Sequence, residues 1–359
     1  MKSKAIRISL RKGVIMNKFV KVLSVALAAL TITFFATTSF AQSINKNISI
    51  SNDISSARVR AEIFLHNMGV DFDVSDSTTL KNITGEYEAV AFDIIGKNSN
   101  GYIIVNINDL SVPELSLESS NPFKNSENPI YNGALSYYDN IDGNLISLDD
   151  NSVVETGDLN YIYHKESISN KTAYIESISL QNVQSNSSVI PYANLERYIP
   201  GKLQQWCTDN GAGNCGSVAA AICMRYYYDY IDSQYVDSNR TAEFLLVPIL
   251  QNHIGAPGTT MPNLARGLTE YMQNERGINN SAASATYKYS IARAEVLKRR
   301  PSLILTSGHP TYRNHIMTVH GFYENNTDGQ FIVVNDTWRA NNVILKSDSI
   351  IRQIVTFER

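Results

Sequence analysis

Apolar residues recur at helical and strand spacings along most of the chain. Residues 55–68 carry apolar side chains three and four positions apart, which predicts a helix. Two apolar runs at 87–95 and 102–107 flank a stretch of turn-forming residues and predict a β-hairpin. Residues 42–52 lack such a pattern and are expected to form a flexible tail. The first part of the chain is therefore predicted to be α+β.

The second part begins with helical patterns and ends with strand patterns. A helix is predicted from Cys215 to about Tyr230, followed by helices near 241–252 and 261–276. After Pro301 the apolar runs become short and predict the strands 302–306, 315–323, 331–335 and 351–357. Helices followed by an antiparallel sheet are typical of an α+β domain.

The first residues have the pattern of a secretory signal peptide. Lys18 and Lys21 precede an apolar run at 22–35, and small residues follow up to Ala41. The alternative is a membrane anchor, but the run is shorter than the roughly 20 residues that span a bilayer. We therefore expect cleavage after residues 1–41, a secreted product, and no membrane contact after that cleavage.

Charge divides the exported chain into two unequal parts. Residues 42–188 carry 8 basic and 20 acidic side chains, a net charge of −12, whereas residues 189–359 carry 16 and 14, a net charge of +2. Between them, residues 179–190 are rich in Ser, Gln and Asn, which favours an exposed linker with a processing region. No basic stripe is present, so no nucleic-acid partner is expected. We predict domains at 42–178 and 191–359.

Cys215 is the candidate nucleophile because it stands at the start of a predicted helix. Free N–H groups and the helix dipole lower the pKa of a thiol at this position. Gly216 is expected to leave room for a substrate, and the N–H of Cys215 is a candidate oxyanion donor. The alternative is a buried structural cysteine. Cys207 and Cys223 could pair, and an odd cysteine leaves at least one free thiol.

Among six histidines, His315 and His320 flank an apolar stretch on one predicted strand. Five positions apart, they are expected to face opposite ways, so that one of them reaches the cysteine. Asp336 would accept a hydrogen bond from the imidazole and orient it, or it is an ordinary turn residue. Trp338 would shield that bond from water, or it belongs to the core.

Metal chemistry has weak support in the sequence. Zinc-binding patterns are missing, and Asp71, Asp73 and Asp76 lack the glycine and distal glutamate of a calcium-binding loop. We expect neither a metal nor a cofactor.

Three short motifs resemble the papain fold. They are Asn214-Cys215-Gly216, Asn314-His315 with Gly321 six positions after the histidine, and Val334-Asn335-Asp336-Thr337-Trp338. The first and last resemble the bacteriocin-processing-peptidase-like branch. The resemblance implies a papain-like domain in which helices carry Cys215 and an antiparallel sheet carries His315 and Asp336. It selects His315 over His320 as the general acid/base.

The position of the papain-like oxyanion glutamine departs from that pattern. Six residues before the cysteine stands Asp209, a poor hydrogen-bond donor. With an insertion in 208–213, the resemblance implies that Gln205 supplies the donor.

Residues 92–107 and 111–115 loosely resemble the inhibitory prodomain of streptopain-type peptidases. That resemblance implies that residues 42–178 form a smaller α+β prodomain that inhibits the enzyme within the same chain. The predicted function is a secreted cysteine endopeptidase made as a zymogen, acting on protein or peptide substrates. The alternatives are another thiol acyl-transfer enzyme, such as a transglutaminase-like crosslinker or a cell-wall amidase, and an inactive secreted binding protein.

Overall fold

The computed structural model divides the chain into two compact units, residues 1–55 and residues 56–359. The sheet and the site described below belong to the second unit. The structure describes residues 50–148, 151–155, 168, 170–184, 193–194, 214–255, 258–309, 313–337, 342–347 and 350–358.

The N-terminal part begins with a helix at 50–68 and continues as a series of mostly antiparallel strands, with one parallel pairing of Lys81 with Ile130. The predicted helix and hairpin are confirmed, and residues 50–52, which we expected in a flexible tail, are helical. The sequence analysis missed β1, whose alternation is interrupted by a register shift between Val74 and Ser77. The strands are β1 (Phe72–Lys81), β2 (Tyr87–Gly96), β3 (Asn100–Asn106), β4 (Glu114–Ser116), β5 (Pro129–Tyr131), β6 (Tyr137–Ile141), β7 (Asn144–Ser147) and β8 (Val153–Val154).

Two short elements lie near the predicted linker. Helix α2 (Lys171–Gln184) covers residues 179–184, so the first residues of the stretch that we expected to be a linker are helical. Strand β9 (Ala193–Asn194) pairs with β12 (Arg313–Asn325) at Gly321 and Phe322. Residues 185–192 lie outside the described residues.

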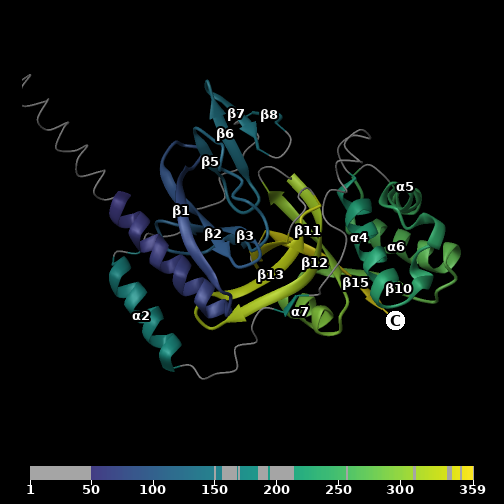
Figure 1. Ribbon diagram of the computed structural model, residues 1–359. Coiled ribbons are helices and arrows are strands. Elements are labelled where there is room, and N and C mark those ends of the chain that lie inside the picture. Colours follow the sequence, from purple (N-terminus) through teal and green to yellow (C-terminus); the bar gives the residue numbers. More distant parts are fainter. Residues whose placement is uncertain are drawn as a thin grey trace, which may run out of the picture. The chain divides into compact units, whose positions relative to one another are not determined.

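In the C-terminal part, helices come first and an antiparallel sheet follows, as predicted (Figure 1). The helix at 215–230 is confirmed at both ends, and the four predicted strands are present. Strands β10 and β14 and helix α7 were not predicted. The elements are α4 (Cys215–Tyr230), α5 (Glu243–Ile254), α6 (Met261–Glu270), a π-helical turn (Tyr271–Glu275), β10 (Ser281–Thr286), α7 (Tyr289–Leu297), β11 (Ser302–His309), β12, β13 (Gly329–Asn335), β14 (Asn342–Lys346) and β15 (Ile351–Glu358).

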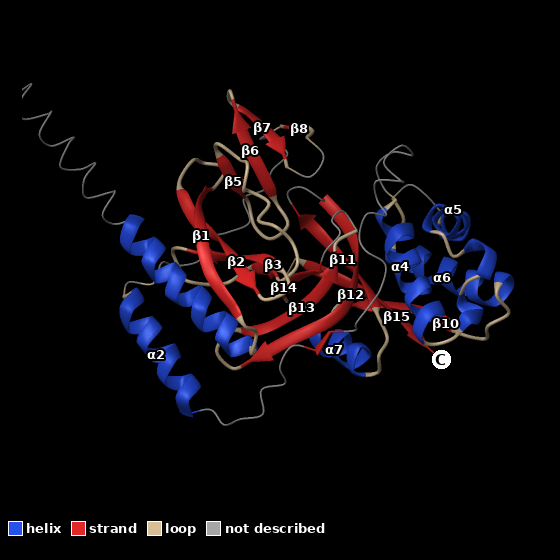
Figure 2. Ribbon diagram, in the orientation of Figure 1, coloured by secondary structure: helices blue, strands red, loops and turns tan. Residues whose placement is uncertain are grey.

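The described strands of both parts belong to one sheet (Figure 2). Its order is β10-β15-β11-β12-β13-β14-β4-β3-β2-β1-β5-β6-β7-β8. The connection between the parts is the antiparallel pairing of β14 with β4, where Ile344 lies opposite Leu115. The fold is therefore α+β, and the linker predicted at 179–190 does not divide the compact unit of residues 56–359.

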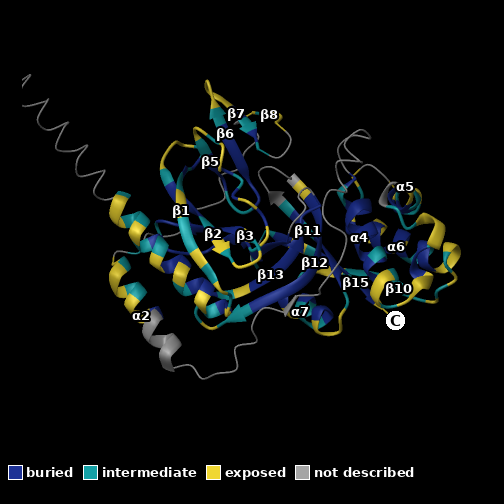
Figure 3. Ribbon diagram, in the orientation of Figure 1, coloured by how far each residue is buried: buried dark blue, intermediate teal, exposed yellow. Residues whose placement is uncertain are grey.

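Helix α4 packs against α5 and against β12, and most of its surface is buried (Figure 3). The small side chains of Ala219, Ala220 and Ala221 are fully buried and allow this close approach. Thr318 of β12 donates its hydroxyl to the carbonyl oxygen of Ala219 at 3.1 Å. This bond fixes α4 against the strand that carries His315.

Candidate functional site

Cys215 is the first residue of α4 and is partly buried. His315, on β12, lies beside this thiol, and so do the main-chain N–H groups of Gly216 and Ile316. Two segments that are distant in the sequence thus meet at one thiol.

The pKa of the Cys215 thiol lies below its ordinary value. Burial is the largest single influence and by itself raises the pKa, because it penalises the thiolate. The side chain and charge of His315 and the two main-chain N–H groups together lower the pKa by more than burial raises it. A lowered pKa enlarges the thiolate fraction at neutral pH, and the thiolate is the nucleophilic form of cysteine.

His315 is buried, and one of its ring nitrogens is held by the segment after β13. Its Nε2 lies 2.7 Å from the main-chain carbonyl oxygen of Asp336. A carbonyl oxygen can only accept a hydrogen bond, so the proton of the neutral ring belongs on Nε2. Nδ1 is then the nitrogen with a lone pair available to take the proton of Cys215.

Asp336 therefore meets His315 through its main chain, whereas the sequence analysis expected its carboxylate to make this contact. The carboxyl side chain is fully buried at this position. The hydroxyl of Thr337 also lies near the ring, with Oγ1 3.4 Å from His315 Nε2. The group that orients His315 is a main-chain carbonyl of this turn, so the side chain at position 336 does not supply the contact.

Asn335 and Thr337 hold that turn, and the sequence analysis assigned neither a role. The side-chain oxygen of Asn335 accepts a hydrogen bond from the N–H of Thr337 at 2.9 Å, as in an Asx turn. Thr337 has φ +64°, a left-handed conformation that is unfavourable for a β-branched residue. Backbone strain of this kind often occurs at functional sites. The signal was an Asn two residues before a Thr where an apolar strand ends.

Gly216 has a different role from the expected one. A Cβ at this position would lie 2.8 Å from Cγ2 of Thr259 and 3.2 Å from Cδ1 of Ile316. Glycine is therefore required because β12 and the segment before α6 pack closely against α4. The space beside Gly216 that we assigned to a substrate is filled by the protein itself.

His320 is buried in a different environment, next to Asn342 and the main chain of Val334. Burial lowers the pKa of His320 to about 3, and these neighbours offset only part of that effect. The register of β12 against β13 shifts between Val319 and Gly321, so strict alternation does not extend to His320. The different contacts of the two histidines, and not their spacing, distinguish their roles.

The remaining predicted residues are placed in part. Gln205, Trp338 and Cys207 lie outside the described residues. Cys223 is a free, fully buried thiol on α4, and burial raises its pKa well above the ordinary value. It is therefore chemically inert in comparison with Cys215.

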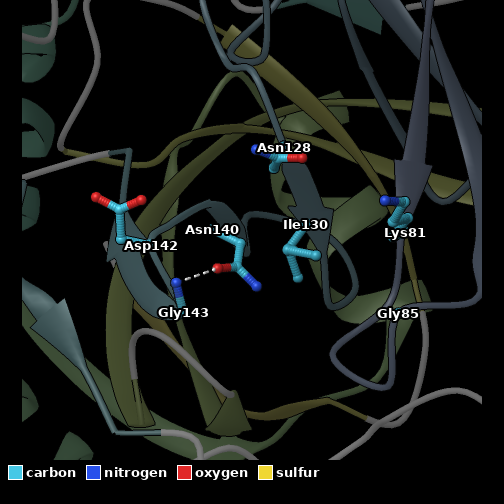
Figure 4. A pocket seen from close by; sticks show the side chains of 7 residues that line it. All are labelled: Lys81, Gly85, Asn128, Ile130, Asn140, Asp142 and Gly143. Atoms are coloured by element: carbon cyan, nitrogen blue, oxygen red, sulfur yellow. Dashed lines mark hydrogen bonds between the residues drawn. The ribbon is translucent and has the colours of Figure 1, made fainter.

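A cavity of about 340 Å³ opens in the N-terminal part (Figure 4). Asn140 lies at its wall, where its side-chain oxygen accepts a hydrogen bond from Gly143 N–H at 3.1 Å. None of the predicted site residues lines this cavity, whose lining consists of Lys81, Gly85, Asn128, Ile130, Asn140, Asp142 and Gly143.

Among the residues that the structure describes, no group of three or more His, Cys, Asp or Glu side chains is arranged to hold a metal ion. Within the same residues, no helix combines the length and apolar character needed to cross a bilayer. In comparisons with known proteins, no family model and no curated protein matches this chain.

Proposed function

We propose that this chain is a papain-fold cysteine peptidase that is secreted as a zymogen. The observation that carries the proposal is that His315 lies beside Cys215 and, with two main-chain N–H groups, lowers the pKa of that thiol in spite of burial. Two further features support the proposal: Cys215 is the first residue of α4, and a backbone turn holds His315 Nε2. Helices bearing the cysteine and an antiparallel sheet bearing the histidine agree with the papain-like arrangement.

In the proposed reaction, the Cys215 thiolate attacks the carbonyl carbon of a peptide bond. The proton that the thiol has given to His315 passes to the leaving amine, which leaves a thioester on Cys215. His315 then takes a proton from water, and the resulting hydroxide hydrolyses the thioester to release the acid and the free thiol. Donors at the start of α4, including the N–H of Cys215, would stabilise the oxyanion, with Gln205 as the proposed side-chain donor.

Asp336 orients His315 in this proposal through its main-chain carbonyl oxygen. Trp338 would shield the contact from water. The N-terminal part, residues 42–178, is the proposed intramolecular inhibitor, and cleavage between about 181 and 197 would activate the enzyme. Its charge of −12 complements the +2 of the following residues.

The deciding experiment is intact mass spectrometry of the secreted wild-type and Cys215→Ala proteins under reducing conditions. The wild type should convert to a fragment that begins near residues 182–198, and both the substitution and a thiol-directed epoxide should block this conversion. Casein digestion should fall by about 10⁴-fold or more in Cys215→Ala. Digestion at the wild-type rate by Cys215→Ala would refute the proposal.

The same samples separate the alternatives. Amine incorporation or peptidoglycan hydrolysis without cleavage of protein would indicate another thiol acyl-transfer enzyme. A folded protein whose Cys215 forms no adduct with the epoxide or with iodoacetamide would be a binding protein that retains the fold.

A further inference from the structure

The N-terminal part completes the sheet of the C-terminal part. Strand β14 pairs with β13 on one side and with β4 on the other, where Ile344 lies opposite Leu115. The N–H of Lys346 also donates to the carbonyl oxygen of Pro113 at 3.0 Å. Without β4, β14 would present an unpaired strand edge, which is unfavourable and prone to pair with other chains.

Side chains reinforce this pairing at the first residue of β14. The hydroxyl of Ser116, which is fully buried, donates to the carbonyl oxygen of Asn342 at 2.6 Å. The side-chain amide of Asn342 donates to Glu118 Oε2 at 3.0 Å. These bonds hold Asn342, the residue at which the chain enters β14 after the His315-binding turn at Thr337.

A second contact region joins the helix at 50–68 to the turn between β12 and β13. Arg60 Nη2 lies 2.7 Å from Asp328 Oδ1, and the side chains are only 3% and 0% exposed. Arg60 also donates to the carbonyl oxygen of Leu110 at 3.0 Å. Asn67 and Tyr323 donate to Asp328 Oδ2 at 3.3 and 2.8 Å. The aspartate is thus held by both parts of the chain.

An aromatic cluster lies in the same region. The ring of Phe64 meets those of Tyr323 and Phe331 edge to face, with centroids 5.5 and 5.2 Å apart. All three side chains are fully buried. Separation of the two parts would expose these rings and would leave Arg60 and Asp328 without each other.

From these contacts we propose that the N-terminal part remains bound after the linker is cut and serves as a permanent subunit of the processed protein. Its partner is the C-terminal part of the same chain, which it recognises through β4 and through the helix at 50–68. None of these contacts depends on residues 185–192. This inference rests on the processing proposed above. Inhibition then depends on the uncut linker, so that cutting the linker relieves it while the N-terminal part stays bound.

The test uses the full chain with Cys215→Ala, so that its result does not depend on peptidase activity. A recognition sequence for an unrelated protease is inserted between Ser187 and Ser188, and the purified protein is cut to completion. Size-exclusion chromatography in native buffer should give one peak at the elution volume of the uncut protein, containing both fragments. The fragments should separate only in denaturant. Two separate native peaks would overturn the proposal.

Arg60→Ala in the same background tests whether the buried ion pair contributes to retention. The fragments of this variant should separate at a lower urea concentration than those of the parent. Arg266→Ala is the matched control, because Arg266 and Glu270 form an exposed pair on α6, and it should leave retention unchanged. If Arg60→Ala does not fold before cutting, Ser116→Ala takes its place. Fragments of the variant that separate at the same urea concentration as those of the Arg266→Ala control would contradict the role of these contacts.

Discussion

Two opposite influences determine the state of the Cys215 thiol. Burial raises its pKa, whereas His315 and two main-chain N–H groups lower it, and the lowering influences prevail. Cys223, on the same helix, is fully buried and has a raised pKa, because the lowering influence of the nearby Thr318 side chain does not offset burial. The difference between the two thiols lies in their neighbours, since both belong to α4.

The first prediction concerns the pH dependence of alkylation at Cys215. The thiolate fraction rises with pH through the thiol pKa, so iodoacetamide should reach half-maximal reactivity below the pH typical of a free cysteine. His315→Ala removes the main influence that lowers the pKa of the Cys215 thiol against burial. The alkylation profile should therefore shift to higher pH. Rates at each pH are measured by mass spectrometry of Cys215 peptides.

Cys223 provides the internal control for this measurement. It should remain unmodified in the native protein and react fully in denaturant. An alkylation profile that does not change between the wild type and His315→Ala would contradict the proposed pair.

The second prediction concerns the turn that holds His315. Asn335→Ala removes the acceptor for Thr337 N–H and should reduce kcat by about 10- to 100-fold through misplacement of the ring. Asp336→Asn keeps the main-chain carbonyl and should retain most of the activity. Peptide-hydrolysis kinetics measure both.

Asn82→Ala is the matched control for Asn335→Ala. Asn82 is also buried, and its side-chain oxygen accepts a hydrogen bond from Thr84 N–H at 3.0 Å in the N-terminal part. Its loss should reduce stability but not kcat. Equal losses of kcat in both variants would show that Asn335 has only a structural role.

At the scale of elements, the site depends on how α4 packs against β12. The helix brings Cys215 to its first position, and the strand brings His315 opposite it. The contact of Thr318 with Ala219 and the close approach at Gly216 fix the distance between the two elements.

The third prediction follows from this packing. Gly216→Ala places a Cβ 2.8 Å from Thr259 Cγ2, so side chains must shift, and overpacking should lower the unfolding free energy by about 1–3 kcal/mol. Part of this loss is offset because Ala favours helix more than Gly. Urea unfolding gives the stability, and the alkylation rate of Cys215 should change as well.

Gly267→Ala is the control at a distance from the thiol. Its Cβ would lie 2.5 Å from the carbonyl oxygen of His253, between α5 and α6, so it should also reduce stability. Its effect on the alkylation of Cys215 should be small. A Gly216→Ala protein with an unchanged alkylation rate would argue against the dependence of the site on this contact.

At the scale of the whole molecule, the shared sheet couples the two parts of the compact unit. Strand β4 is paired on both sides, and the Arg60–Asp328 pair and the Phe64 cluster link the same parts elsewhere. Unfolding of one part should therefore remove support from the other.

The fourth prediction concerns this coupling. Arg60→Ala leaves Asp328 buried without its cation and should lower the unfolding free energy by about 3–5 kcal/mol, with a single transition in urea. Circular dichroism and tyrosine fluorescence should report the same midpoint. Arg266→Ala, which breaks an exposed pair, should change stability by less than about 1 kcal/mol. Separate transitions in the parent protein would contradict the coupling.

The sequence alone determined those features that depend on local pattern. The helix at 215–230 was predicted at both ends because apolar residues recur with helical period, and the strands at 302–306 and 331–335 were marked by short apolar runs. The local pattern predicted that Cys215 at a helix start would meet one of the two histidines on one strand, and the resemblance to the papain fold selected His315 over His320. Strand β14 was missed, although its apolar run at 343–345 is as long as the run that marked the strand at 302–306.

The tertiary structure alone decided which atoms meet. The main-chain carbonyl of Asp336 holds His315 because an Asx turn and a left-handed Thr337 point it there, and no residue pattern specifies a backbone direction. The surroundings of Gly216 and the sharing of one sheet by both parts depend on contacts between residues far apart in sequence. Local periodicity specifies elements, but only long-range packing specifies their neighbours.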